Sequence, residues 1–169
     1  KSQEYYVLAE ALLKKYYKSP EDYTFIYKQK GKELKNLTYQ PLFNYIKKSN
    51  IADEYKGQFF QILTWEFVST EDGTGIVHTA PSFGEDDFNA VANLLGGETS
   101  KEWLFMPVDE YGCFTSEVPD YQGIKVMESN KPITEHLKAN QKIVKTESLV
   151  HSYPHCRRCK TPLIYKAMS

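Results

Sequence analysis

Apolar residues near the start of the chain recur at helical spacing. Over residues 4–17 they follow one another every three or four positions, as on one face of an α-helix. The pair Ser19-Pro20 comes directly afterwards, and proline ends a helix because it lacks a backbone N–H. The pattern therefore predicts a first helix over Glu4–Tyr17.

Two later segments show the same spacing between clear start and stop residues. The run GEDD at residues 84–87 is predicted to open a helix with an apolar face over 88–95, and Gly96-Gly97 ends it. A third helix is predicted over residues 130–140, with Asn130 as its N-cap and Pro132 in its first turn.

The remaining segments are rich in aromatic and β-branched residues, which is typical of strands. Strands are predicted at residues 23–27, 34–39, 58–69, 75–79 and 142–150, and a hairpin over 106–114 around Glu110-Tyr111-Gly112. The turn Glu71-Asp72-Gly73 is predicted to lead into the 75–79 strand. Many short strands with few helices favour a β-barrel over a βαβ sheet. We therefore expect a mainly β fold with peripheral helices, a closed or half-closed barrel forming a single domain over residues 1–169.

Composition narrows the class of protein. Of the 169 residues, 41% are hydrophobic and the formal net charge is −1, values typical of a folded globular chain rather than a disordered one. No apolar run approaches the ~20 residues of a membrane span. Three cysteines cannot build a disulfide framework, which favours a reducing compartment. The chain has no signal peptide and starts at Lys1 rather than Met, so we interpret it as a piece of a longer polypeptide.

The charges fall into blocks along the chain. Residues 1–56 and 151–169 each carry a net charge of +4, and residues 101–150 carry −2. Residues 57–100 contain no Lys or Arg and carry −7. Single charges usually lie on a solvated surface, but a cleft lined by the acidic block would attract a cation and repel phosphate. The two basic ends could hold an anionic polymer.

The densest candidate for chemistry is the segment Gly73–Phe88. A predicted strand carries His78, a loop with proline and glycine follows, and the next helix begins with acidic residues. The carboxylates suit the positive end of a helix dipole, and a single strand histidine is often only packed. A strand end and the helix after it also meet at one rim, where His78 and one residue of the Asp86-Asp87 pair would face a common ligand.

Other catalytic templates are absent from the sequence. It contains no Gly-x-Ser-x-Gly elbow, no His-Glu-x-x-His pattern, no phosphate-binding P-loop and no dinucleotide fingerprint. Cys113 lies in a predicted turn with no evident histidine partner, which makes a Cys–His nucleophile a weak interpretation.

A second cluster lies near the end of the chain. Cys156 and Cys159 have the spacing of a zinc knuckle, and His155 or His151 could assist them. A structural zinc site needs four ligands, and the chain offers no second Cys-x-x-Cys pair. The cluster is therefore either half of a zinc site or a pair of reduced surface thiols.

Several of these motifs resemble the editing domain of isoleucyl-tRNA synthetase, and the resemblance covers nearly the whole chain. The matching runs are GTGIVHTAP at residues 73–81 with Asp86-Asp87, LKNLTYQPLF at 34–43, PVD at 107–109, GCF at 112–114, HSYPHC at 151–156 and TPLIY at 161–165. Valyl and leucyl relatives share the Gly-Thr-Gly start and the later Asp, but are expected to carry Lys or Met in place of His78. That position favours the isoleucyl type.

The resemblance implies a fold, an activity and partners. It implies a β-barrel inserted into a class I, ATP-using cytoplasmic synthetase, whose residues 151–169 lead back to the catalytic body. It implies hydrolysis of valine wrongly esterified to isoleucine tRNA, and of valyl-adenylate as a further substrate. The implied partners are the 3′ end of tRNA(Ile) and the rest of the parent synthetase, with no membrane and no cofactor in this domain.

The resemblance also assigns roles to individual residues. Asp87 is expected to hold the α-ammonium of the misplaced amino acid, and His78 to line the side-chain pocket and exclude isoleucine. The pocket walls are expected to include Thr74, Gly75, Thr79, Ala80, Phe83 and Asp86, the last with helix capping as its alternative role. The attacking water is expected to be positioned partly by the terminal ribose of the tRNA.

The chain departs from the family pattern in one respect. The family carries a threonine-rich strand upstream of residues 4–17 that contributes to the editing pocket, and Lys1 comes after that point. The fragment is therefore expected to be weak or inactive alone. Two alternatives to isoleucyl editing stay open: a valyl- or leucyl-type editing domain, and a non-catalytic tRNA-docking or zinc-knuckle module built on Cys156 and Cys159.

Overall fold

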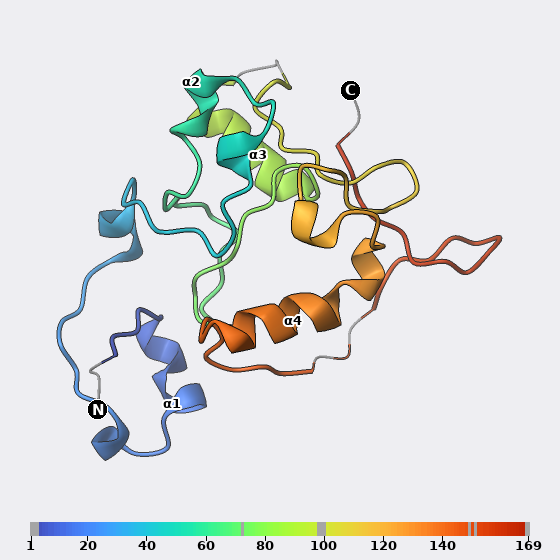
Figure 1. Ribbon diagram of the computed structural model, residues 1–169. Coiled ribbons are helices and arrows are strands. Elements are labelled where there is room, and N and C mark those ends of the chain that lie inside the picture. The colour runs from blue at the N-terminus through green and yellow to red at the C-terminus, as the bar shows by residue number, and fades with distance from the viewer. Residues whose placement is uncertain (1–3, 72, 98–100, 149, 151, 168–169) are drawn as a thin grey trace. The chain divides into compact units, whose positions relative to one another are not determined.

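The computed structural model describes residues 4–71, 73–97, 101–148, 150 and 152–167 (Figure 1). Within these residues the α-helices are α1 (Leu13–Tyr16), α2 (Asp53–Lys56), α3 (Glu85–Leu94) and α4 (Asn130–Ala139). Short 3-10 helices lie at Glu10–Leu12, Pro20–Asp22, Gly31–Leu34, Ile46–Lys48, Pro119–Tyr121 and Val126–Glu128. None of the helices in the described ranges is both long enough and apolar enough to cross a lipid bilayer.

The chain divides into two compact units, each made of two segments. The first unit comprises Lys1–Tyr39 and Gln61–Ala80. The second unit comprises Gln40–Phe60 and Pro81–Ser169. The single domain over residues 1–169 stays a prediction.

The prediction of a mainly β fold with a barrel is wrong. The described residues contain no β-strand and no sheet, and their β-type pairing consists of isolated antiparallel bridges. The bridges are Thr38 with Gln61, Val108 with Phe114, Cys113 with Lys125, and His155 with Pro162. A strand needs several successive pairs, and here each pairing stops after one.

Backbone conformation explains why the Thr38–Gln61 pairing does not extend. The N–H of Asn36 donates to the carbonyl of Ile62 at 2.9 Å, and the N–H of Ile62 donates to the carbonyl of Leu37 at 2.8 Å. Asn36 has φ 67° and Phe60 has φ 60°, which is left-handed backbone. Extended strands need negative φ, so one residue on each paired segment ends the ladder.

The predicted hairpin over 106–114 reverses as expected but stays short. Asp109 N–H donates to the carbonyl of Cys113 at 2.9 Å, and Asp109 Oδ1 accepts from the N–H groups of Tyr111 and Cys113 at 2.9 and 2.8 Å. Gly112, with φ 77°, supplies the left-handed residue of the turn. The carboxylate of Asp109 thus closes a tight loop in the second unit.

The first predicted helix is much shorter than its apolar pattern. Ordered helical turns begin only at Glu10, and α1 spans Leu13–Tyr16. Ala9 has extended backbone (φ −65°, ψ 133°), and its N–H donates to the carbonyl of Thr74 at 2.8 Å. This bond to a distant segment takes the place of a helical one.

The two other predicted helices are present. Helix α3 ends where Gly96, with φ 77°, leaves helical backbone. Helix α4 begins at Asn130, where the predicted range begins, but its N-cap is Ser129 rather than Asn130. Ser129 is almost fully buried, and its hydroxyl donates to the carbonyl of Val126 at 2.7 Å.

The core of the second unit fixes the position of α3. Trp103 is 1% exposed, and its ring lies 5.2 Å from the ring of Phe88 in the first turns of α3, centroid to centroid. Val108, Val118 and Tyr121 are each 5% exposed. Burial of these large apolar groups anchors the N-terminal part of α3 to the unit.

Candidate functional site

The acidic residues predicted to carry chemistry occupy the first turn of α3. Gly84 is the N-cap, and Glu85, Asp86 and Asp87 follow it. The N–H of Phe88 donates to the carbonyl of Gly84 at 2.9 Å, which closes the first helical turn. Because the helix N-terminus has partial positive charge, carboxylates are stable there in their ionised form.

Asp87 differs from its neighbours in the direction of its side chain. Glu85 and Asp86 are exposed, whereas Asp87 is half-buried. A Cβ built on Gly84 would lie 2.8 Å from Asp87 Oδ2 and 3.2 Å from Asp87 Cγ. The Asp87 carboxylate is therefore folded back over the N-cap, toward the loop that precedes α3.

That loop is fixed by Ser82. Ser82 is 3% exposed, and its hydroxyl donates to the carbonyl of Phe105 at 2.6 Å. Its own carbonyl accepts the N–H of Ala167 at 2.9 Å. The nearby Lys166 ammonium donates to the carbonyl of Val108 at 2.6 Å. These bonds join three separate segments of the second unit next to the start of α3.

Sequence reasoning does not reveal this anchoring role of Ser82. A serine in a Pro/Gly-containing loop is usually exposed, and only the position of Phe105 and Ala167 shows why it is buried. The sequence also does not indicate why position 84 is glycine. Its φ of −145° is an angle that any residue can adopt, so the backbone conformation does not require glycine there.

His78 lies in the first unit, with Thr74, Gly75, Thr79 and Ala80, whereas Phe83, Asp86 and Asp87 lie in the second. The His78 side chain is exposed, as are Ile76 and Val77 before it. The predicted strand that would carry His78 is absent from the described residues. The shared rim of His78 and Asp87 stays a prediction.

Thr74 and Gly75 have clear structural roles in the first unit. The Thr74 carbonyl accepts the N–H of Ala9, and its Oγ1 lies 3.4 Å from the N–H of Ile76, which donates to it. Gly75 has φ 77°, and an added Cβ would lie only 2.6 Å from Ala9 Cβ. Only glycine fits there, because the backbone is left-handed and Ala9 is in contact.

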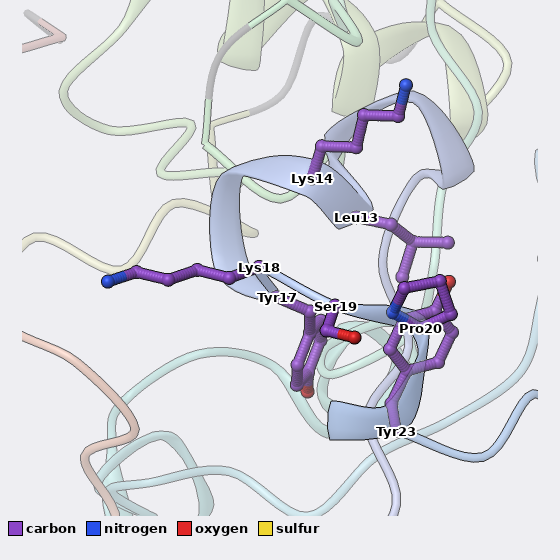
Figure 2. A pocket seen from close by; sticks show the side chains of 7 residues that line it. All are labelled: Leu13, Lys14, Tyr17, Lys18, Ser19, Pro20 and Tyr23. Carbon is purple, nitrogen blue, oxygen red and sulfur yellow. The ribbon is translucent and has the colours of Figure 1, made fainter.

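Two hollows of the first unit are lined by residues other than the predicted site residues. Figure 2 shows one of about 230 Å³ beside α1, where Tyr17 and Tyr23 lie with ring centroids 5.1 Å apart and the Lys14 and Lys18 side chains extend outward. Another, of about 610 Å³, is lined by Thr64, Trp65 and Glu66. Among the described residues that line these two hollows, none is a predicted site residue.

Cys156 and Cys159 lie on one tight turn of the second unit. The N–H of Cys156 donates to the carbonyl of Thr161 at 2.9 Å, and Lys160, with φ 61°, reverses the backbone. Cys159 Sγ lies 3.1 Å from Thr161 Oγ1. The Thr161 hydroxyl and backbone, with help from Cys156, lower the pKa of Cys159 to about 7.

The turn brings together two thiols and no third ligand. Both cysteines are free, Cys159 exposed and Cys156 half-buried. His155 Nδ1 lies 2.8 Å from the carbonyl of Tyr153, and His151 lies outside the described residues. Across the described ranges, no three or more His, Cys, Asp or Glu side chains are grouped closely enough to hold a metal ion. The two thiols alone would give half of a zinc site.

Comparison with known proteins identifies the relatives of this chain. No protein-family model matches it. A protein of Treponema denticola is 43% identical over 177 residues and 98% of the chain, and one of Corynebacterium diphtheriae is 47% identical over 166 residues and 96%. A third, from Saccharomyces cerevisiae, is 37% identical over 166 residues and 97% of the chain. All are isoleucine–tRNA ligases.

The chain is thus homologous to isoleucine–tRNA ligases over nearly all of its length. It spans only 15%, 14% and 15% of the length of these three relatives, respectively. The similarity therefore extends to one segment of a much longer enzyme. It confirms the resemblance to isoleucyl-tRNA synthetases, and the assignment to their editing domain stays a prediction.

Proposed function

We propose that this chain is the hydrolytic editing domain of an isoleucine–tRNA ligase and removes valine from mischarged tRNA(Ile). The observation that carries the proposal is the half-buried Asp87 carboxylate, folded back at the start of α3. It lies in a block, residues 57–100, that contains no Lys or Arg. In a homologue of isoleucine–tRNA ligases, such an acid suits a substrate with a free ammonium group.

The physical need for such an activity follows from pocket chemistry. A pocket that accepts isoleucine cannot strongly reject valine, which lacks one methylene group, and isoleucine–tRNA ligases are the standard example of this limit. A second, smaller pocket that hydrolyses valyl esters corrects the error. Isoleucine is excluded from it by size.

Asp87 binds the α-ammonium group in this proposal. A carboxylate and an ammonium form a charge-assisted hydrogen bond, about twice as strong as a neutral one. Residues 57–100 contain no Lys or Arg, and the negative charge of this block repels phosphate and attracts an ammonium group. His78 contacts the valine side chain and sets the size limit.

The reaction needs little further chemistry from the protein. Water adds to the ester carbonyl carbon, the bond to the ribose oxygen breaks, and valine leaves with a free carboxyl group while the ribose regains its hydroxyl. An aminoacyl ester is already activated, so positioning of the ester and the water supplies much of the rate. The 3′ end of tRNA(Ile) and the rest of the synthetase are the partners, and the cytoplasm is the proposed location.

Substitution of Asp87 in the full-length enzyme tests the proposal. Asp87→Ala is expected to slow deacylation of Val-tRNA(Ile) by about 10- to 100-fold or more, because a hydrogen bond to a charged group is lost. Aminoacylation with isoleucine is expected to stay at the wild-type rate. Glu85→Ala, which removes a neighbouring exposed carboxylate, is the matched control and is expected to edit normally.

An Asp87→Ala enzyme that deacylates Val-tRNA(Ile) at the wild-type rate would contradict the proposal. Equal losses in the Asp87 and Glu85 variants would also contradict it, since the effect would then be one of total charge at the helix start.

One observation favours a different role, that of a non-catalytic zinc-knuckle or tRNA-docking module. The Cys156–Cys159 turn places a thiol whose pKa is about 7 next to a second thiol. Thiolates are the form that binds zinc. The two roles are distinguished by measuring zinc content and editing in the purified full-length enzyme and in its Cys159→Ser variant. If the variant loses zinc and still edits at the wild-type rate, the Cys156–Cys159 turn has a structural role only.

A further inference from the structure

The contact between Gly84 and Asp87 depends on the absence of a side chain at position 84. A Cβ at Gly84 would lie 2.8 Å from Asp87 Oδ2, 3.2 Å from its Cγ and 3.5 Å from its Cβ. A non-bonded separation of 2.8 Å is well inside van der Waals contact for a carbon and an oxygen atom. The Asp87 carboxylate therefore occupies space that any other residue at position 84 would fill.

Backbone conformation does not require glycine at this position. Gly84 has φ −145° and ψ 134°, an extended conformation that every residue adopts. Gly75 is the contrasting case, because its φ of 77° and its contact with Ala9 both demand glycine for the fold itself. At Gly84 the three heavy atoms nearest to an added Cβ all belong to the Asp87 side chain.

We propose that Gly84 is a positioning residue that sets the direction of the Asp87 carboxylate. The inference rests on the proposed function of Asp87 as the ammonium-binding group. A methyl group at position 84 pushes the carboxylate outward from the N-cap, since a side-chain end moves more easily than backbone. In the Gly84→Ala variant α3 stays in place, because the Phe88 ring remains packed on the buried Trp103 ring.

The same geometry distinguishes Asp87 from Asp86. Asp86 is exposed, and no part of its side chain lies within the three nearest atoms around the Gly84 Cβ position. Displacement by a methyl group at position 84 therefore acts on one carboxylate of the pair. This selectivity makes the substitution a probe of Asp87 that leaves its charge intact.

The test compares Gly84→Ala, Asp87→Ala and the double variant in the full-length enzyme. Each is assayed for deacylation of valyl-tRNA(Ile) and of its 2-hydroxyisovaleryl analogue, an ester of the same shape that lacks the ammonium group. Gly84→Ala is expected to slow deacylation of the valyl ester by about 10- to 100-fold, the range expected when a charged hydrogen bond is lost. The 2-hydroxyisovaleryl ester is expected to react at its wild-type rate.

The deacylation rate of the double variant distinguishes positioning of Asp87 from a general effect on the fold. If Gly84 acts through Asp87, the double variant is no slower than Asp87→Ala alone. Gly57→Ala is the matched control: Gly57 also lies in the second unit, has an ordinary φ of −70°, and has no atom within 4 Å of an added Cβ. The Gly57→Ala enzyme is expected to match the wild type on both esters.

The outcomes separate this inference from the proposed function. If Asp87→Ala edits normally, the proposed function fails and Gly84 has nothing to position. If Asp87→Ala is impaired while Gly84→Ala is normal, only the inference about Gly84 is overturned. Equal slowing of both esters by Gly84→Ala, or effects that multiply in the double variant, also overturn it, since Gly84 would then act on the fold.

Discussion

At the scale of single residues, the direction of a side chain distinguishes Asp87 from the other acids of α3 more than its residue type does. Three acids open α3, yet only the half-buried Asp87 has its carboxylate placed over Gly84. The sequence singled out the Asp86-Asp87 pair from its place between a predicted strand and a helix. It could not show the roles of Gly84 and Ser82, because an ordinary extended glycine and a loop serine leave no periodic pattern.

Cys159 provides a residue-scale prediction with a defined pH dependence. The Thr161 hydroxyl stabilises the thiolate, which lowers the pKa of Cys159 to about 7 from an ordinary value of 9.0. The rate of alkylation by iodoacetamide is therefore expected to rise with pH and reach half its maximum near pH 7, because the thiolate is the reactive form. Mass spectrometry of the alkylated peptide follows this cysteine separately from Cys113 and Cys156.

Thr161→Val removes the hydroxyl with little change of shape. In that variant the midpoint of Cys159 alkylation is expected to move to higher pH. An unchanged midpoint would show that Thr161 does not stabilise the thiolate.

At the scale of elements, the two longer helices were predictable from the sequence, whereas the predicted strands were not found among the described residues. Helices α3 and α4 each carry their apolar spacing over ten residues between clear start and stop residues, and local bonds suffice to form them. A strand depends on a distant partner that the local pattern does not contain. The left-handed backbone of Asn36 and Phe60 ends the Thr38–Gln61 pairing after one bridge.

The shortened first helix has the same cause. The apolar spacing over residues 4–17 fits a helix, but the Ala9 N–H bonds to Thr74, 65 positions further along the chain by number. No local pattern reveals such a contact. The chain here follows a tertiary bond in preference to helix propensity.

The packing of α3 on Trp103 gives an element-scale prediction. Trp103→Ala is expected to lower the free energy of unfolding by about 3–5 kcal/mol, as for other large aromatic residues removed from a core. Trp103→Phe is expected to cost much less, because the ring contact with Phe88 is kept and the indole Nε1–H has no hydrogen-bond partner among the described residues. Urea unfolding of the chain followed by circular dichroism measures both values.

Tyr111→Ala is the control for these variants. Tyr111 is 77% exposed, so its removal is expected to change the free energy of unfolding little. If Trp103→Ala unfolds at the same urea concentration as Tyr111→Ala, Trp103 is not the anchor of α3.

At the scale of the whole molecule, the chain matches only a small part of the length of its relatives. Its homology to isoleucine–tRNA ligases covers 98% of this chain and 15% of the Treponema denticola relative. His78 lies in the first unit and Asp87 in the second. The proposed activity is therefore best tested in the full-length enzyme with its tRNA.

The central claim is that Asp87 binds the ammonium group of valine while His78 contacts its side chain. A crystal structure of the full-length enzyme with a non-hydrolysable valyl-adenosine analogue tests it most directly. We expect an ammonium nitrogen about 2.7–2.9 Å from an Asp87 carboxylate oxygen, with the isopropyl group against the His78 ring. An analogue bound elsewhere, or bound with Asp87 and His78 on opposite sides of the molecule, would contradict it.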